Sequence, residues 1–196
     1  METARYLSDW LILAKKPMHG IAVMKTAISS LCKPEEISGF HTQFTKLCLK
    51  AKCYQHSLRI IQEPITQVML TTSAIEVISY NYYRGLLFTG LHMYQEALDS
   101  FNKVFILPAQ LLHQVHVDAF KKASLVSLIH SGKKFELPEK TVDSLRNAFI
   151  KYASESDVPY GSTVAPVNVY HIINEIHAFG KVGDLETAIS NNLETL

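Results

Sequence analysis

Hydrophobic and polar residues follow a helix-pair pattern most clearly between Gly85 and Pro108. The packing positions Gly85, Phe88, Tyr94, Ala97, Phe101 and Val104 stand at offsets 0, 3, 9, 12, 16 and 19. A tetratricopeptide repeat places its small and bulky packing residues at these spacings. A small residue lets two helices approach closely, and bulky residues at helical spacing fill the inner face. The pattern predicts one helix over Thr72–Thr89, a turn near Tyr94 and a second helix that ends at Pro108.

Weaker copies of this pattern flank the strong one. Tyr54, Ser57 and Ile61 repeat the offsets of the turn and second helix forty residues earlier, after a predicted helix over Ser38–Ala51. Pro64 is expected to truncate or bend the second helix of that unit. Downstream, a long apolar helix over Leu111–Ser131 leads to Phe135, forty-one residues after Tyr94. A period of about forty residues made of helix pairs predicts a solenoid.

The two ends of the chain extend the same organisation. Helices over Ala4–Lys15 and Met18–Leu31, split by Pro17, form a predicted leading pair within residues 1–36. The repeats occupy residues 37–153, an exposed loop residues 154–166, and a terminal pair residues 167–196, where Gly183, Leu185 and Ala188 repeat the turn pattern. No alternating run suggests a sheet. The predicted fold is therefore all-α, a tetratricopeptide-like right-handed solenoid of antiparallel helix pairs.

Composition narrows the class of protein. Hydrophobic residues make up 47% of the chain and its formal net charge is +1, which is typical of a globular domain. A dedicated nucleic-acid binder usually carries a concentrated basic face, so we expect no nucleic acid as partner. The apolar run from Trp10 stops at Lys15, well short of a membrane-spanning helix. Three cysteines are too few for a disulfide framework and favour reduced, intracellular thiols.

For each candidate catalytic or metal-binding residue, packing or a position at the surface is the simpler interpretation. Cys48, Cys53 and His56 could hold zinc, but the two cysteines are five residues apart and point to different sides of a helix. Packing of the two thiols is the better interpretation, and no metal or cofactor is expected. His113 and His116 share a helix face, which we expect to border the surface. No motif of a hydrolase or a phosphate-binding loop is present, so the chain is not expected to be an enzyme.

Several segments resemble one family in their order and spacing. They are Leu47–Tyr54, Tyr80–Gly85, Gly90–Leu91, Phe120–Ile129 and Leu137–Pro138. Together they resemble the third subunit of the COP-nine signalosome and, more distantly, its counterpart in the proteasome lid. The resemblance runs from about Pro17 to the carboxyl end of the chain.

The resemblance implies a non-catalytic subunit of the complex that removes the ubiquitin-like modifier Nedd-eight from cullins. In that family, helical repeats lead into a PCI domain capped by a winged helix, for which this chain has no room. The chain is therefore expected to be a fragment, a splice form or a reduced homologue. The implied partners are other signalosome subunits and, indirectly, cullin-RING ligases, in the cytoplasm and nucleus. An independent tetratricopeptide-type adaptor for peptide tails and a subunit like that of the proteasome lid stay open as alternatives.

Five residues are candidate partner contacts: Tyr80, Tyr83, Arg84, Lys121 and Lys122. They accompany core residues on predicted helices, yet they are polar enough to face a partner. The leading pair between Trp10 and Leu31 is expected to be adhesive when nothing covers it, which predicts marginal stability or self-association in isolation.

Overall fold

A computed structural model describes residues 2–33, 35–107, 112–133, 135–141, 143 and 145–148. In chain order, its elements are α1 (Glu2–Leu13), α2 (Met18–Leu31), β1 (Glu36–Ile37), α3 (Gly39–Lys50), α4 (Tyr54–Gln62), β2 (Gln67–Val68), α5 (Ala74–Gly90), α6 (Tyr94–Ile106) and α7 (Gln114–Ser131). The predicted all-α helical-repeat class is confirmed. The predicted loop 154–166 and terminal pair 167–196 lie outside the described residues, and the right-handed sense of the solenoid stays a prediction.

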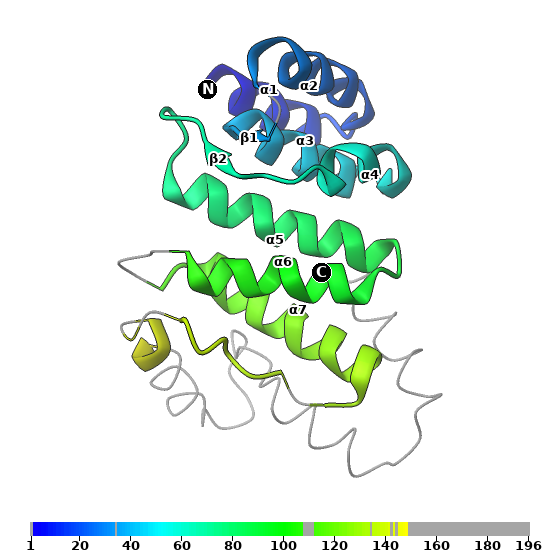
Figure 1. Ribbon diagram of the computed structural model, residues 1–196. Coiled ribbons are helices and arrows are strands. Elements are labelled where there is room, and N and C mark those ends of the chain that lie inside the picture. Colours follow the sequence, from blue (N-terminus) through cyan, green and yellow to red (C-terminus); the bar gives the residue numbers. More distant parts are fainter. Residues whose placement is uncertain are drawn as a thin grey trace, which may run out of the picture.

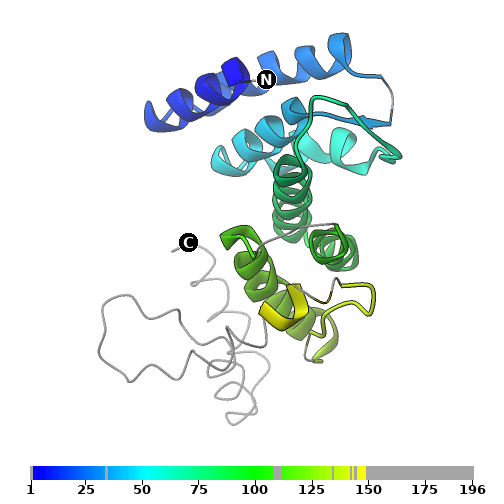
Figure 2. The same cartoon turned by 90° about the vertical axis from the view of Figure 1, so that its left-hand side faces the viewer.

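The helices stack in pairs along one direction. The first helices of successive units pack against each other, α1 on α3, α3 on α5 and α5 on α7. Each second helix also packs on the first helix of the next unit, α2 on α3, α4 on α5 and α6 on α7. Figures 1 and 2 show the resulting order, with α1 and α2 at one end of the stack. Each pair therefore contacts its neighbours in the manner of a solenoid.

The turn inside each pair has the same backbone geometry in three units. Lys15, Lys52 and His92 adopt positive φ angles of 56°, 54° and 59°. The residue after each donates its N–H to the carbonyl five residues earlier, Lys16 to Leu11, Cys53 to Cys48 and Met93 to Phe88, each at 2.9 Å. This is the Schellman arrangement that ends a helix through a left-handed residue. The leading pair is therefore a repeat unit of the same kind as the strong one.

Burial repeats with the same period. Residues 51–60 and residues 91–100 share the same class, buried, half-buried or exposed, at every position. Ser57 and Ala97, the small residues at the two crossings, are both 0% exposed, as are Ile61 and Phe101 one turn further on. The predicted forty-residue repeat is confirmed at the level of side-chain packing.

Gly85 makes the close approach that its spacing predicts. A Cβ atom on Gly85 would lie 2.5 Å from the Phe101 ring, closer than two carbon atoms can stand. Val104 and Ala97 on the same inner face of α6 are 0% exposed. α4 ends at Gln62, two residues before Pro64, as predicted from the missing N–H and fixed φ of proline.

Two helices begin later than their patterns predict, because capping boxes fix their starts. α5 begins at Ala74 rather than Thr72, since Ser73 and Glu76 close a reciprocal capping box around the first turn. α7 begins at Gln114 rather than Leu111, since His113 and His116 form the same kind of box. At these two helix starts, the capping residues rather than the apolar periodicity determine the first helical residue.

A small sheet contradicts the prediction that the chain has none. β1 and β2 pair in parallel, Glu36 with Gln67 and Ile37 with Val68. Both lie in the segments that join one pair to the next, where two extended backbones run side by side. Two residues a strand are too few to leave an alternating pattern in the sequence. The sheet places Ile37 against Tyr80 and Val77 in a second, small hydrophobic cluster.

Candidate partner-binding surfaces

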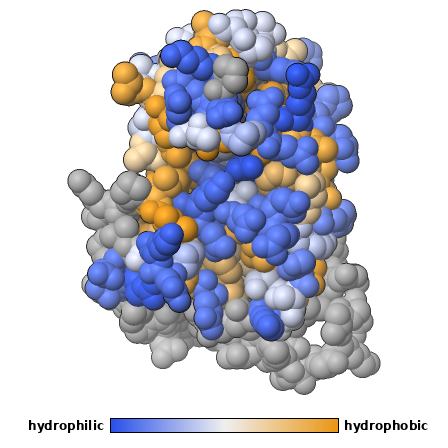
Figure 3. Space-filling model, in the orientation of Figure 1, coloured by the Kyte–Doolittle hydropathy of each residue, from blue (hydrophilic) through white to orange (hydrophobic). Residues whose placement is uncertain are grey.

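An apolar stripe lies uncovered on α1, at the end of the stack. Tyr6, Trp10 and Leu13 occur at offsets 0, 4 and 7, so they share one helix face. Their side chains are 69%, 63% and 82% exposed. We call these three residues the leading stripe. Figure 3 shows one side of the molecule, with hydrophobic side chains gathered towards its upper left and a largely hydrophilic middle.

The opposite face of α1 is held firmly on the stack. Leu11 is 6% exposed and lies in the main core with residues of α2 and α3. The Lys46 Nζ atom lies 2.6 Å from Asp9 Oδ1, which ties α1 to α3 by an ion pair. The leading stripe is therefore presented by an anchored helix, and its exposure does not come from a loose terminus.

Tyr80 and Lys122 are buried in this chain, which argues against them among the predicted partner contacts. Tyr80 is 0% exposed and Lys122 is 8% exposed. Burial raises the pKa of the Tyr80 hydroxyl to about 12, and burial lowers the pKa of Lys122. Sequence spacing could not reveal this, because the linker that carries β1 covers Tyr80 with Ile37.

Tyr83, Arg84 and Lys121 are half-buried and stay candidates. Arg84 already has a role inside the chain, because its Nε donates a hydrogen bond of 2.7 Å to the carbonyl of Ile61. Its guanidinium carbon also lies 5.3 Å from the centre of the Phe88 ring. Arg84 thus joins α5 to the end of α4, and only the remainder of its guanidinium is available to a partner.

Two histidines take structural positions that the sequence patterns did not predict. His41 accepts a hydrogen bond of 3.2 Å at Nδ1 from the backbone N–H of Ser38. It is 5% exposed, and burial lowers its pKa to about 4. His116 accepts at Nδ1 from the N–H of His113 at 3.1 Å. His116 is 0% exposed, so the expectation that it borders the surface is wrong.

The cysteines are free thiols without metal-site geometry. Cys48 is buried, and burial raises the pKa of its thiol to about 12, which favours an inert, neutral group. Cys53, at the turn inside the α3–α4 pair, has its Sγ 2.9 Å from the thioether of Met18 at the start of α2 in the preceding pair. Among the described residues, no group of three or more His, Cys, Asp or Glu side chains could hold a metal ion.

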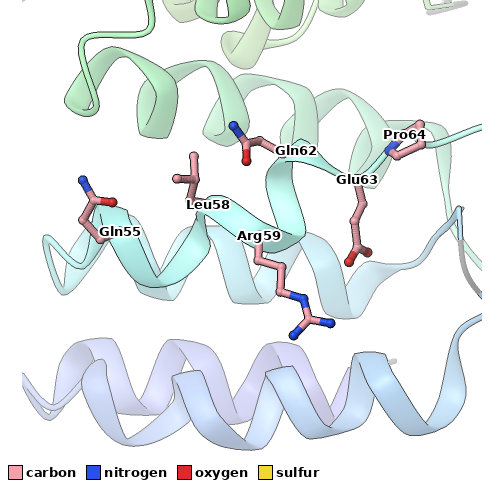
Figure 4. Close-up of a pocket in the computed structure, with 6 residues that line it drawn as sticks. All are labelled: Gln55, Leu58, Arg59, Gln62, Glu63 and Pro64. Carbon is pink, nitrogen blue, oxygen red and sulfur yellow. The ribbon is translucent and has the colours of Figure 1, made fainter.

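A shallow depression lies along α4. It is lined by Gln55, Leu58, Arg59, Gln62, Glu63 and Pro64. In Figure 4, Leu58 and Gln62 extend towards the later, green helix, whereas Arg59 and Glu63 extend towards the earlier, blue helices. Because the lining holds a cation, Arg59, together with a carboxylate, Glu63, the depression suits a polar contact better than the binding of a free peptide carboxylate.

Across the part of the chain that the structure describes, none of the helices combines the length and the apolar character needed to cross a membrane.

Repeated turns, repeated burial and stacked pairs define an all-α tandem helix-repeat protein. The family model described as COP9 signalosome complex subunit 3, N-terminal helical repeats, matches residues 1–144. The chain belongs to this family. It is similar to COP9 signalosome complex subunit 3 of Dictyostelium discoideum, 33% identical over 146 residues, and of Arabidopsis thaliana, 26% identical over 187 residues. These alignments cover 71% and 94% of this chain, but only 35% and 40% of the two relatives.

Proposed function

We propose that this chain acts as a non-catalytic scaffold of the signalosome, binding neighbouring subunits through its stacked helix pairs. The observation that carries the proposal is the membership of residues 1–144 in the subunit 3 helical-repeat family. The stack of helix pairs supports it, because solenoids of this kind present extended surfaces to their partners. Half-buried Tyr83 and Lys121 are further candidate contacts.

The wider role follows from the same proposal. As part of that complex, the chain would contribute to removing the ubiquitin-like modifier Nedd-eight from cullins while supplying no catalytic group itself. Cullin-RING ligases would then be indirect partners, and the cytoplasm and nucleus the places of action. An independent adaptor for peptide tails has less support, since the depression along α4 offers Arg59 next to Glu63 in place of converging cations.

Affinity purification of the tagged chain from cells tests the proposal. We expect several signalosome subunits to co-purify in comparable amounts with the tagged chain. Recovery of chaperones alone, or of no defined set of chains, would overturn it. Lys121→Glu and Tyr83→Glu report on the predicted contacts, and Lys50→Glu on an exposed position of α3 is a matched control for the change in charge.

A further inference from the structure

The linker between α4 and α5 carries a strand, β2, with one free edge. Gln67 and Met69 donate their N–H groups to carbonyls of the β1 segment, at 3.2 and 2.9 Å. Because backbone polar groups alternate in direction along a strand, the N–H and C=O of Val68 face away from β1. Within the described part of the chain, neither of these two groups has a hydrogen-bond partner. In Figure 1 this linker crosses the front of the stack from the end of α4 towards the start of α5.

The side chains around this edge are uncharged, and several of them are apolar and exposed. From Ile65 to Ile75 the chain contains no charged residue and no proline, which are the residues that guard many free strand edges. Val68, Leu70 and Ile75 are 52%, 103% and 38% exposed. We call the backbone of Val68 together with these three side chains the β2 edge. Helix pairs stack on both sides of the linker, so the β2 edge is a feature of the middle of the solenoid.

An extended segment is the occupant that this edge fits. An incoming strand can pair with the free N–H and C=O of Val68, whereas a helix bonds its own backbone groups internally. Ile37 and Val68 are paired across the two strands, so their side chains lie on the same face of the sheet. Ile37 is buried in a cluster with Val77 and Tyr80, but Val68 is exposed. A strand that covered Val68 with an apolar side chain would therefore widen this small cluster.

Charge around the β2 edge indicates what the ends of such a segment should carry. Residues 33, 35–37 and 63–76 hold four acidic side chains and one basic side chain, a net charge of −3. The acids are Glu35, Glu36, Glu63 and Glu76, and the base is Lys33. The hydrogen bonds that Glu35, Glu36 and Glu76 accept come from hydroxyl and backbone N–H groups, which leaves the negative charge in place. Lysine or arginine at the ends of an incoming segment would complement this field.

We propose that the β2 edge binds an extended segment of a partner protein, with apolar residues in its centre and lysine or arginine at its ends. The segment adds a third strand to the sheet, pairs with the backbone of Val68 and covers the exposed side chains beside it. The inference rests on the proposed scaffold function. It adds strand pairing at a linker as a mode of contact, together with the chemistry of the segment that is bound.

A labelled peptide tests the inference through fluorescence anisotropy with the full 196-residue chain. The peptide has about nine residues, somewhat more than an average strand, with alternating valine and threonine in the centre and lysines at both ends. We expect saturable binding. Methylation of single peptide amides should weaken binding roughly tenfold or more where the amide faces β2, and should be tolerated at the amides between. A peptide held by its side chains alone would not show this dependence on alternate amides.

Variants of the chain locate the site. Val68→Pro removes the outward N–H but neither of the N–H groups that bond to the β1 segment, and should weaken peptide binding roughly tenfold. Val68→Ile keeps the N–H and a β-branched side chain, so it should bind as the unaltered chain does. Glu63→Lys should weaken binding of the lysine peptide, whereas Glu96→Lys, at an exposed position of α6, should not. Circular dichroism checks that Val68→Pro folds, and the methylated peptides give a test that does not depend on that variant.

Four results would overturn the inference. They are no saturable binding, equal effects of methylation at every peptide amide, binding unaffected by a folded Val68→Pro variant, and equal affinity for peptides with lysine and with glutamate ends. A dimer of the chain alone in sedimentation, which Val68→Pro dissociates, would also overturn it and assign the β2 edge to a second copy. Peptide binding that depends on alternate amides, without co-purification of signalosome subunits, would support the inference and count against the scaffold function alone.

Discussion

The leading pair and the α5–α6 pair are built alike but placed differently. Both turn through a left-handed residue, Lys15 in one and His92 in the other, with the same hydrogen bond behind it. Helices stack on both sides of the α5–α6 pair, and Phe101 is 0% exposed there. The α1–α2 pair is covered on one side, and Trp10 is 63% exposed. In a solenoid, neighbours decide whether a large apolar side chain stabilises the fold or binds a partner.

Truncating one aromatic residue in each pair should give the largest difference between the pairs in the free energy of unfolding. Phe101→Ala empties a closed space beside Gly85, and we expect a loss of about 3–5 kcal/mol in the free energy of unfolding. Trp10→Ala removes a side chain that is mostly in water already, so its cost should stay within about 0.5 kcal/mol. Urea denaturation followed by circular dichroism measures both. Equal losses for the two variants would refute the contrast between the pairs.

Acid should weaken the stack through His41. This imidazole is neutral when buried, with a pKa lowered to about 4, while in the unfolded chain its pKa is near 6.5. The unfolded state therefore binds the proton more readily, and stability present above pH 6.5 is lost as the pH falls towards 4. The loss for this single group is on the order of 3 kcal/mol. Burial also lowers the pKa of His116, which adds in the same direction.

A matched substitution isolates the histidine. Glutamine at position 41 keeps an acceptor for the Ser38 N–H, since Gln at the third helical position closes a capping box, but it does not titrate in this range. His41→Gln should flatten the dependence of unfolding free energy on pH between 6.5 and 4. His19→Gln, at an exposed position of α2, should leave the dependence unchanged. A steep curve retained in His41→Gln would show that other groups cause the acid sensitivity.

Adding one methyl group to a glycine of each pair should show how firmly each is packed. Gly85→Ala drives a Cβ atom into the Phe101 ring, which is fixed on all sides, and should cost about 1–3 kcal/mol. Gly20→Ala meets only the ends of Leu11 and Leu47, which are flexible and lie near the open end of the stack. We expect a cost below about 1 kcal/mol there. Thermal melting of both variants measures the difference, and a larger loss for Gly20→Ala would reverse the ranking.

Substitutions in the shared turn should change the free energy of unfolding least. They also test most closely whether the two pairs are built alike. Glycine adopts a left-handed conformation without the steric cost that other residues carry, so Lys15→Gly and His92→Gly should each stabilise the chain by up to about 1 kcal/mol. Gln95→Gly, at an exposed helical position nearby, should instead cost about 1 kcal/mol. Chemical denaturation of the three variants provides the measurement. A loss in Lys15→Gly alone would show that the leading turn differs from the others.

Helix pairing could be predicted because its signals are local. Gly85, Ala97 and Phe101 stand at fixed spacings along two adjacent helices, and the structure places them as predicted. Helix starts at Ser73 and His113 were missed by apolar periodicity, since capping depends on single polar residues. The β1–β2 pairing was missed because two-residue strands from separate linkers carry no pattern of their own.

The candidate partner contacts were harder to predict, because burial depends on distant segments. Tyr80 and Tyr83 lie three residues apart in one helix, yet Tyr80 is buried against Ile37 of the linker and Tyr83 is only half-buried. The leading stripe could have been found from the spacing of Tyr6, Trp10 and Leu13. A single sequence does not say, however, which units of a stack have neighbours on both sides. That distinction needs the order of the helices in space.

Hydrogen exchange on the tagged chain, alone and in its co-purified complex, tests the central claim most directly. If neighbouring subunits bind the uncovered end of the stack, amides of α1 should exchange more slowly in the complex. Amides of α5 and α6, already buried between neighbours, should change little, because their protection reflects the fold itself. Unchanged exchange in α1, with new protection confined to α5 and α6, would contradict the account.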